Sequence, residues 1–298
     1  MIERNSDNII YNYSVPADWY EGLYKDKKPC CSAARPFCLL HEKPTKECWL
    51  LIHGYRGYPG ELVRPAEDLY DAGFDVYVPR LPGHGTCGKD FIHSCEDDWL
   101  GVIQNAIEDL KKQYDKVNLL GHSMGTAIAA ILGCNNSAVG KIIYVCPSFE
   151  NLQMTPISRL ILKVLSPFTP KVHCKWHPSS KYHLHYENAP CDDMYLGMEY
   201  FQWYFTKKLA EYYHIIKQGL KSVSDYPHEH LVICPMRDKI ISIPSTELYL
   251  KAVQDKANVV YVENATHCIF YDKDPSAENK AVEAVLEFAR KNKIYNKH

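Results

Sequence analysis

The segment KVNLLGHSMGTAIAA, residues 116–130, carries the strongest structural pattern in the chain. It opens with a short apolar run (117–120), passes through GHSMG with Ser123 at its centre, and closes with small, helix-favouring residues (126–130). A sharp turn from strand to helix requires a glycine two residues either side of the serine, because side chains there would collide. The segment therefore predicts a strand, a strained turn that exposes the Ser123 hydroxyl, and a helix N-terminus that attracts negative charge. A loop serine that only caps the helix is the alternative interpretation.

The composition of the chain is that of an ordinary globular protein. Its 298 residues, 46% hydrophobic and 23% charged, suit one large α/β domain or two small ones. The net charge of −2, with histidines neutral, gives no electrostatic reason to expect nucleic acid or an acidic membrane surface as a partner. A small-molecule partner fits this balance better.

The N-terminal sequence predicts no export signal. MIERNSDNIIYNYSVPADWY lacks the apolar run of a signal peptide, and no later stretch is apolar enough to span a bilayer. Several of the twelve cysteines, among them Cys48, Cys146 and Cys234, fall in expected core strands, where cysteine acts as a small hydrophobe. We therefore expect a cytoplasmic protein with reduced thiols and no integral membrane segment. The oligomeric state stays open.

Apolar runs alternate with helical patterns from residue 48 onward. The continuous apolar run CWLLIH (48–53) is typical of a strand buried on both faces. The alternation predicts an α/β fold with a doubly wound, mostly parallel sheet and helices on both faces. Residues 8–15 and 36–42 are candidate edge strands of an antiparallel start. The other expected strands are 74–79, 117–120, 141–146, 231–235 and 259–262, and the expected helices are 59–72, 97–115, 245–256 and 277–291.

Residues 150–223 interrupt this alternation after the sixth expected strand. They contain an amphipathic pattern (154–168), a stretch dense in tyrosine and histidine, and a second helical pattern (209–220). Helices inserted between strands of a parallel sheet lie over its C-terminal edge, where ligands bind. We therefore expect a helical cap, or lid, formed by residues 150–223 over a core formed by residues 1–149 and 224–298. The alternative is that these apolar stripes simply pack on the core.

A serine hydroxyl needs partners to act as a nucleophile at neutral pH: a base, an acid that orients the base, and donors for the oxyanion. His267 follows the strand at 259–262, and Asp238 follows the strand at 231–235, so both are expected at the same sheet edge as Ser123. The order Ser123, Asp238, His267 is that of a hydrolase built on this type of sheet. The alternatives are a polar loop role for His267, a turn-capping role for Asp238, and Glu150 as the acid.

Two backbone N–H groups are expected to hold the oxyanion. Met124, directly after the serine, supplies one from the helix N-terminus, and Tyr55, in the loop after the strand at 48–53, supplies the other. His53 is expected to brace this loop.

Five segments together resemble the α/β-hydrolase superfamily, in particular its carboxylesterase, monoacylglycerol-lipase and serine-aminopeptidase-like branch. They are LLIHGYRG (50–57), RLPGHGT (80–86), LLGHSMGTAIA (119–129), PMRDKIIS (235–242) and ATHCIFYD (265–272). The resemblance covers residues 48–149 and 224–298. It implies the catalytic triad Ser123, Asp238 and His267, an oxyanion hole from the N–H groups of Tyr55 and Met124, a lid from the inserted segment, and no metal or organic cofactor.

The sequence thus predicts a serine hydrolase that cleaves carboxylic esters of acyl or aromatic acids through an acyl-enzyme intermediate. The aromatic cap favours an acyl chain or aromatic acyl group over a charged substrate. One alternative is a peptidase or amidase, and another is a non-catalytic binding protein on a hydrolase scaffold. An aminopeptidase needs cap carboxylates for the substrate's ammonium, and the candidates are Glu187, Asp192, Asp193 and Glu199.

A metal site in the cap is a further hypothesis, because zinc sites use spaced cysteines and histidines. No finger-type pairing is present, however, and a polar aromatic surface is the preferred interpretation. The residues concerned are His173, Cys174, His177, His183 and His185.

Overall fold

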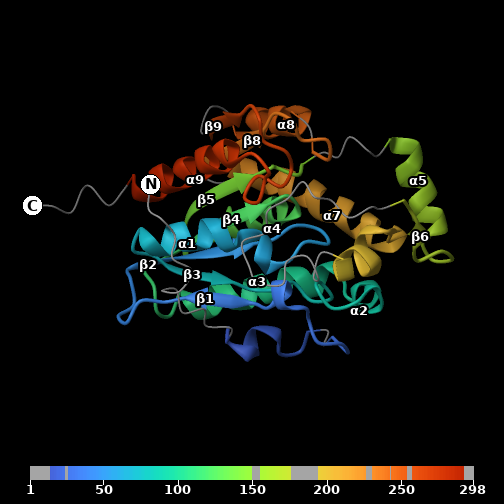
Figure 1. Ribbon diagram of the computed structural model, residues 1–298, viewed down its shortest axis with the longest axis horizontal. Helices are drawn as coiled ribbons and strands as arrows, with labels where there is room; N and C mark the ends of the chain where they lie inside the picture. The colour runs from blue at the N-terminus through green and yellow to red at the C-terminus, as the bar shows by residue number, and fades with distance from the viewer. Residues whose placement is uncertain are drawn as a thin grey trace, which may run out of the picture.

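The computed structural model describes residues 14–23, 26–149, 155–175, 194–225, 230–241, 243–253 and 257–291. Within these residues a seven-stranded sheet runs in the order β1-β3-β2-β4-β5-β8-β9, from the lower to the upper side of Figure 1. β1 pairs antiparallel with β3, and the other neighbours are parallel. The expected mostly parallel sheet with an antiparallel start is confirmed. The strands are β1 (Phe37–Leu39), β2 (Glu47–Ile52), β3 (Asp75–Val78), β4 (Lys116–His122), β5 (Val139–Val145), β8 (His230–Pro235) and β9 (Ala257–Val262).

Helices cover both faces of this sheet, which makes it doubly wound. Alternate residues of β2 show the two faces: Cys48, Leu50 and Ile52 belong to the core cluster on the side of α3, α4 and α8, whereas Trp49 and Leu51 belong to the cluster on the side of α1 and α9. A strand buried on both faces must be apolar throughout, which explains the continuous run at 48–53. The helices of the core are α1 (Val63–Asp71), α2 (Gly88–His93), α3 (Glu96–Leu110), α4 (Met124–Gly133), α8 (Ile243–Val253) and α9 (Pro275–Arg290).

Two helices differ most from their predicted boundaries. The expected helix at 59–72 begins as a 3-10 turn, Pro59–Leu62, and becomes α-helical only at Val63. The expected helix at 97–115 ends at Leu110, where the chain turns before β4. The expected strand at 8–15 lies outside the described residues except for its last two, so the inserted segment follows the fifth described strand, β5.

The inserted segment between β5 and β8 has one outlying part and one part that packs on the core. Figure 1 places α5 at the far end of the molecule, away from the sheet, whereas α7 lies beside α4. A Cβ atom on Gly219 of α7 would stand 2.8 Å from the Cα of Ala127 in α4, so the two helices are in close contact. The described elements here are α5 (Pro156–Leu165), β6 (Val172–His173), a π-helical turn (Gly197–Phe201), β7 (Trp203–Tyr204) and α7 (Thr206–Ser222).

The apolar stripe of α5 does not pack on the core. The five large apolar side chains of α5 whose burial the structure describes are between 49% and 72% exposed. The alternative interpretation, in which these stripes simply join the core, therefore does not hold for α5. The side chains are Ile157, Leu160, Ile161, Val164 and Leu165, and Phe168, just beyond the helix, is also exposed. Among the described helices, none combines the length and the apolar character needed to cross a membrane.

Candidate active site

Ser123 stands on a strained turn between β4 and α4. Its backbone has φ 53° and ψ −120°, a conformation that a non-glycine residue adopts only when the surrounding structure enforces it. Ser123 is 6% exposed and precedes Met124, the first residue of the helix. The predicted strand, sharp turn and helix are all present, with the serine at the helix N-terminus.

Two glycines make this turn possible. A Cβ atom on Gly121 would overlap the backbone of Gly125, and a Cβ atom on Gly125 would overlap the carbonyl oxygen of Ile52 at the end of β2. Backbone atoms cannot move aside as the end of a flexible side chain can. The turn is therefore packed directly against the neighbouring strand.

Replacing Gly125 by alanine is expected to lower the free energy of unfolding by about 1–3 kcal/mol, the usual cost of overpacking. Gly133→Ala, in the same helix, is the matched control. Its nearest contacts would be side-chain methyl groups and not backbone atoms: those of Ile142, Leu119 and Val139, at 2.8, 2.9 and 3.5 Å. Urea denaturation of both variants measures the difference. Equal stability of the two variants would contradict the account of the turn.

Asp238 and His267 form a hydrogen-bonded pair at the same sheet edge. Nδ1 of His267 donates to Oδ2 of Asp238 over 2.7 Å. The other carboxylate oxygen, Oδ1, accepts the backbone N–H groups of Ile240 and Ile241 over 2.7 and 3.0 Å. Burial raises the pKa of Asp238, but the hydrogen bond and charge of His267 and these two N–H groups outweigh it and lower the pKa overall. The carboxylate is therefore held in its charged form.

The pair lies next to the turn that carries the serine. The ring of His122, the residue before Ser123, is 5.1 Å from the ring of His267 between centroids. The structure thus brings the three predicted residues to one edge, at the ends of β4, β8 and β9. Glu150, the alternative acid, lies outside the described residues.

The loop after β2 lies against the serine. A Cβ atom on Gly54, the residue before Tyr55, would stand 3.0 Å from Cβ and 3.4 Å from Oγ of Ser123. His53 braces this loop: its Nδ1 donates to the Gly54 carbonyl and its Nε2 accepts the N–H of Leu81, both over 3.0 Å. Burial lowers the pKa of His53 to about 3, so its ring stays neutral in this role.

Arg56 links this loop to the inserted segment, a role that sequence reasoning missed. Its backbone has φ 59°, and its Nη1 donates to the carbonyl oxygens of Tyr200 and Trp203 over 3.3 and 3.0 Å. The acceptors are backbone atoms more than 140 positions away, so no local pattern could have indicated the contact. These two hydrogen bonds attach the loop that is expected to supply an oxyanion donor to the inserted segment.

Aromatic rings fill the junction between the core and the inserted segment. The Tyr55 ring lies 5.4 Å from Phe91, 6.5 Å from Trp99 and 5.2 Å from Tyr212 between centroids. These neighbours are at most 3% exposed. Tyr212 of α7 is therefore buried against Tyr55 together with Phe91 of α2 and Trp99 of α3, which joins the cap to the core at this point.

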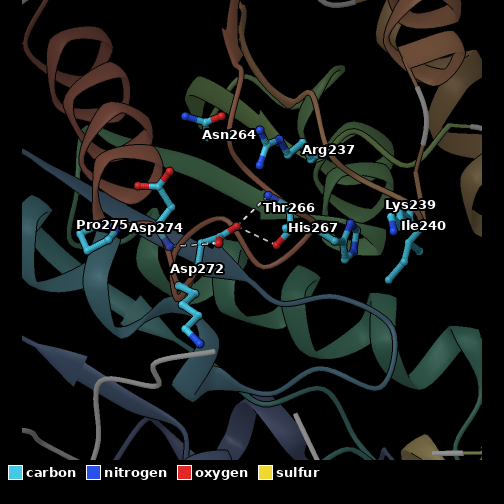
Figure 2. A pocket seen from close by; sticks show the side chains of 10 residues that line it. Arg237, Lys239, Ile240, Asn264, Thr266, His267, Asp272, Asp274 and Pro275 are labelled. Carbon is cyan, nitrogen blue, oxygen red and sulfur yellow. Dashed lines mark hydrogen bonds between the residues drawn. The ribbon is translucent and has the colours of Figure 1, made fainter. Parts of the chain in front are cut away.

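A cleft of about 670 Å³ is lined in part by His267. Figure 2 shows its lining side chains, which come from the loops after β8 and β9 and from the start of α9. Asp272 accepts hydrogen bonds from the backbone N–H and the hydroxyl of Thr266, both over 2.7 Å. Most of the lining side chains are charged or polar, although apolar atoms make up the larger part of the cleft surface. Its lining residues are Arg237, Lys239, Ile240, Asn264, Thr266, His267, Asp272, Lys273, Asp274 and Pro275.

The proposed metal ligands of the cap are only partly within the described residues. His173 packs its ring against Trp203 at 5.3 Å between centroids, and Cys174 donates from Sγ to the Phe201 carbonyl over 3.3 Å. His177, His183 and His185 lie outside the described residues. Elsewhere in the described chain, potential ligand atoms of Cys146, Asp238 and His267 lie within 4.8 Å of one another, in the site itself.

Comparison with known proteins shows the family. The sequence pattern of the family described as serine aminopeptidase, S33 matches residues 43–274. The chain belongs to this family. Over 118 residues it is 31% identical to a thermostable monoacylglycerol lipase from a Bacillus species, covering 40% of this chain and 46% of that one. Over 85 residues it is 27% identical to a carboxylesterase from Bacillus subtilis, covering 28% and 35%. Each match thus spans less than half of the curated relative.

Solved structures that resemble this chain share its fold. A metagenome-derived lipolytic enzyme superposes with a TM-score of 0.72 at 20% identity, covering 89% of this chain and 100% of that one. The monoacylglycerol lipase of Paleococcus ferrophilus gives a TM-score of 0.68 at 19% identity, covering 85% and 97%. The α/β-hydrolase fold expected from the sequence is confirmed.

Proposed function

We propose that this protein is a serine hydrolase that cleaves carboxylic esters through an acyl-enzyme intermediate. The observation that carries the proposal is the hydrogen-bonded pair Asp238–His267 beside Ser123 on its strained turn. The partial matches to proteins named monoacylglycerol lipase and carboxylesterase support ester chemistry.

In the proposed mechanism, Oγ of Ser123 attacks the carbonyl carbon of the ester while Nε2 of His267 takes the hydroxyl proton. The N–H groups of Tyr55 and Met124 hold the oxyanion of the tetrahedral intermediate. His267 then gives its proton to the leaving alcohol, which leaves Ser123 acylated. Water, deprotonated by His267, attacks the acyl carbon, and the proton returns to Ser123 as the acid departs. Asp238 stabilises the charged imidazole throughout.

The proposed substrate is a small ester of an acyl or aromatic acid. Tyr55, which is half-buried and backed by the buried rings of Phe91 and Trp99, supports an apolar acyl part. The charged and polar side chains around the cleft beside His267, among them Arg237 and Lys239, support a polar alcohol part. We also propose that residues 150–223 form a lid. A cytoplasmic location with reduced thiols stays a prediction. The cysteines that the structure describes are all free thiols.

A series of p-nitrophenyl acyl esters of increasing chain length tests this proposal. We expect turnover with an initial burst of p-nitrophenol, because an acyl-enzyme accumulates when water attacks more slowly than Ser123. A fluorophosphonate probe should label the protein at Ser123. A folded protein that neither hydrolyses these esters nor reacts with the probe would be a non-catalytic binding protein, the alternative from the sequence.

The family description favours one second candidate, an aminopeptidase. Such an enzyme needs a carboxylate free to hold the substrate's ammonium. Glu199 is engaged, because its Oε2 accepts the N–H of Gly88 over 2.8 Å. The other candidates, Glu187, Asp192 and Asp193, lie outside the described residues. Comparing kcat/KM for acyl esters and aminoacyl amides separates the two functions, and a higher value for the amides would favour the aminopeptidase.

A further inference from the structure

The backbone carbonyl of His267 accepts two side-chain hydrogen bonds. His122 donates one from Nε2 over 2.9 Å, and Cys146 donates the other from Sγ over 3.4 Å. Both side chains are buried, His122 being 3% exposed and Cys146 0%. Most loop carbonyls are satisfied by backbone groups or water. Two buried side chains that converge on this single carbonyl therefore require an explanation.

The carbonyl fixes the tautomer of His122. A carbonyl oxygen only accepts, so the proton of the neutral ring sits on Nε2 and Nδ1 keeps its lone pair. Nδ1 is buried and has no hydrogen-bond partner among the residues that the structure describes, which costs free energy. Burial first, and the nearby charge of His267 second, lower the pKa of His122 to about 3. The neutral ring adds no positive charge beside His267, which must itself become charged in the proposed mechanism.

Both donors stand at strand ends that are held in the sheet. His122 is the last residue of β4. Cys146 follows β5 with φ 53°, and its N–H donates to the carbonyl of Ile233 in β8 over 3.0 Å. His267, by contrast, lies on the loop after β9. The two donors therefore tie a loop residue to the central strands.

We infer that His122 is a positioning residue for His267 and that Cys146 is the second donor. The inference rests on the proposed function, in which His267 must reach Ser123 while it holds Asp238. Asp238 orients the imidazole, and the His122 and Cys146 bonds fix the backbone of the same residue. His122 directly precedes Ser123 in the chain. The hydrogen bond from His122 to the carbonyl of His267 therefore links the residue next to the nucleophile with the backbone of the base.

Two amide variants at position 122 test this inference. The amide nitrogen of glutamine reaches the place of Nε2, whereas that of asparagine, one carbon shorter, reaches only the place of Nδ1. We expect His122→Asn to lower kcat for an acyl ester about 10–100-fold, as a misplaced base does, with KM within about twofold. His122→Gln should recover most of the loss. A purely structural role would lower Tm and kcat alike in both variants, so equal kcat values overturn the inference.

Cys146 supplies a second test that does not depend on how the His122 variants fold. Cys146→Ser keeps a donor for the carbonyl of His267, and Cys146→Ala removes it at similar size. We expect a smaller loss of kcat in Cys146→Ala than in His122→Asn, and full or nearly full kcat in Cys146→Ser. Because both donors share one acceptor, the double variant His122→Asn/Cys146→Ala should lose more than the product of the single losses. Identical kcat in the alanine and serine variants contradicts the assignment.

Labelling with a fluorophosphonate probe separates this inference from the proposed function. If the unaltered protein does not react with the probe at Ser123, both the proposed function and the inference that rests on it are contradicted. Normal labelling of the unaltered protein, together with an unchanged labelling rate in His122→Asn, removes the inference alone. Slower labelling of His122→Asn than of His122→Gln supports both.

Discussion

Replacing Ser123 by alanine should lower kcat for acyl esters about 10⁵–10⁶-fold, the loss typical of an enzyme deprived of its nucleophile. The change removes a single oxygen atom, and no acyl-enzyme can form without it. The fold should remain intact, because the backbone of the turn is held by other contacts: the Ser123 N–H donates to the Val145 carbonyl over 2.9 Å. Steady-state ester hydrolysis and thermal denaturation measure the two effects.

Ser137→Ala is the matched control for this variant. Ser137 is an exposed serine between α4 and β5, at the opposite end of the strands from Ser123. Its replacement should leave kcat unchanged. Activity retained by Ser123→Ala would remove this residue from the mechanism, and the burst of p-nitrophenol should disappear together with turnover.

Replacing Asp238 by asparagine should lower kcat about 10⁴-fold, the loss typical when the orienting acid of such a triad is made neutral. The structure gives the reason. The Oδ1 side of Asp238 faces two backbone N–H groups, from Ile240 and Ile241, so an asparagine keeps its carbonyl oxygen there. Its NH₂ group then faces Nδ1 of His267 and forces the ring proton onto Nε2. A protonated Nε2 cannot accept the proton of Ser123.

Asp274→Asn is the control for Asp238→Asn. Asp274 lines the same cleft and caps α9, where its Oδ1 accepts the N–H of Ser276 over 3.0 Å. Asparagine is as good a helix cap as aspartate, so stability should be nearly unchanged. The orienting bond from Nδ1 of His267 to Asp238 stays in place, so kcat should fall far less than in Asp238→Asn. If Asp238→Asn were no less active than Asp274→Asn, the orienting acid would have to be another residue.

Local patterns in the sequence predicted the elements that surround Ser123. The continuous apolar run at 48–53 became β2 because both faces of that strand are covered, and the glycines at 121 and 125 mark places where only a backbone fits. The loop positions of Asp238 and His267 after their strands followed from the alternation of strands and helices. Each of these inferences needed only the residues of one element or the order of elements.

Contacts between distant residues could not be predicted in the same way. The bond from His122 to the carbonyl of His267 joins a side chain to a backbone atom. Every residue type has this carbonyl, so the residue type at the acceptor position does not indicate the bond. The same holds for Arg56 and the carbonyl of Trp203. For α5, the periodicity correctly predicted an amphipathic helix, but periodicity does not state what covers its apolar side, and here that side is exposed.

The close approach of α7 to α4 limits which part of the inserted segment can be replaced by that of another family member in a chimaeric protein. Gly219 leaves no space for a side chain above Ala127, which lies one turn beyond Ser123 in the same helix. A chimaera that imported a foreign α7 with a larger residue at position 219 would push α4, and the turn in front of it, out of place. A graft confined to α5, Pro156–Leu165, would keep α7 and the carbonyls of Tyr200 and Trp203 that hold Arg56, and would transfer the outlying helix alone. The interchangeable module is therefore shorter than the insertion counted along the chain.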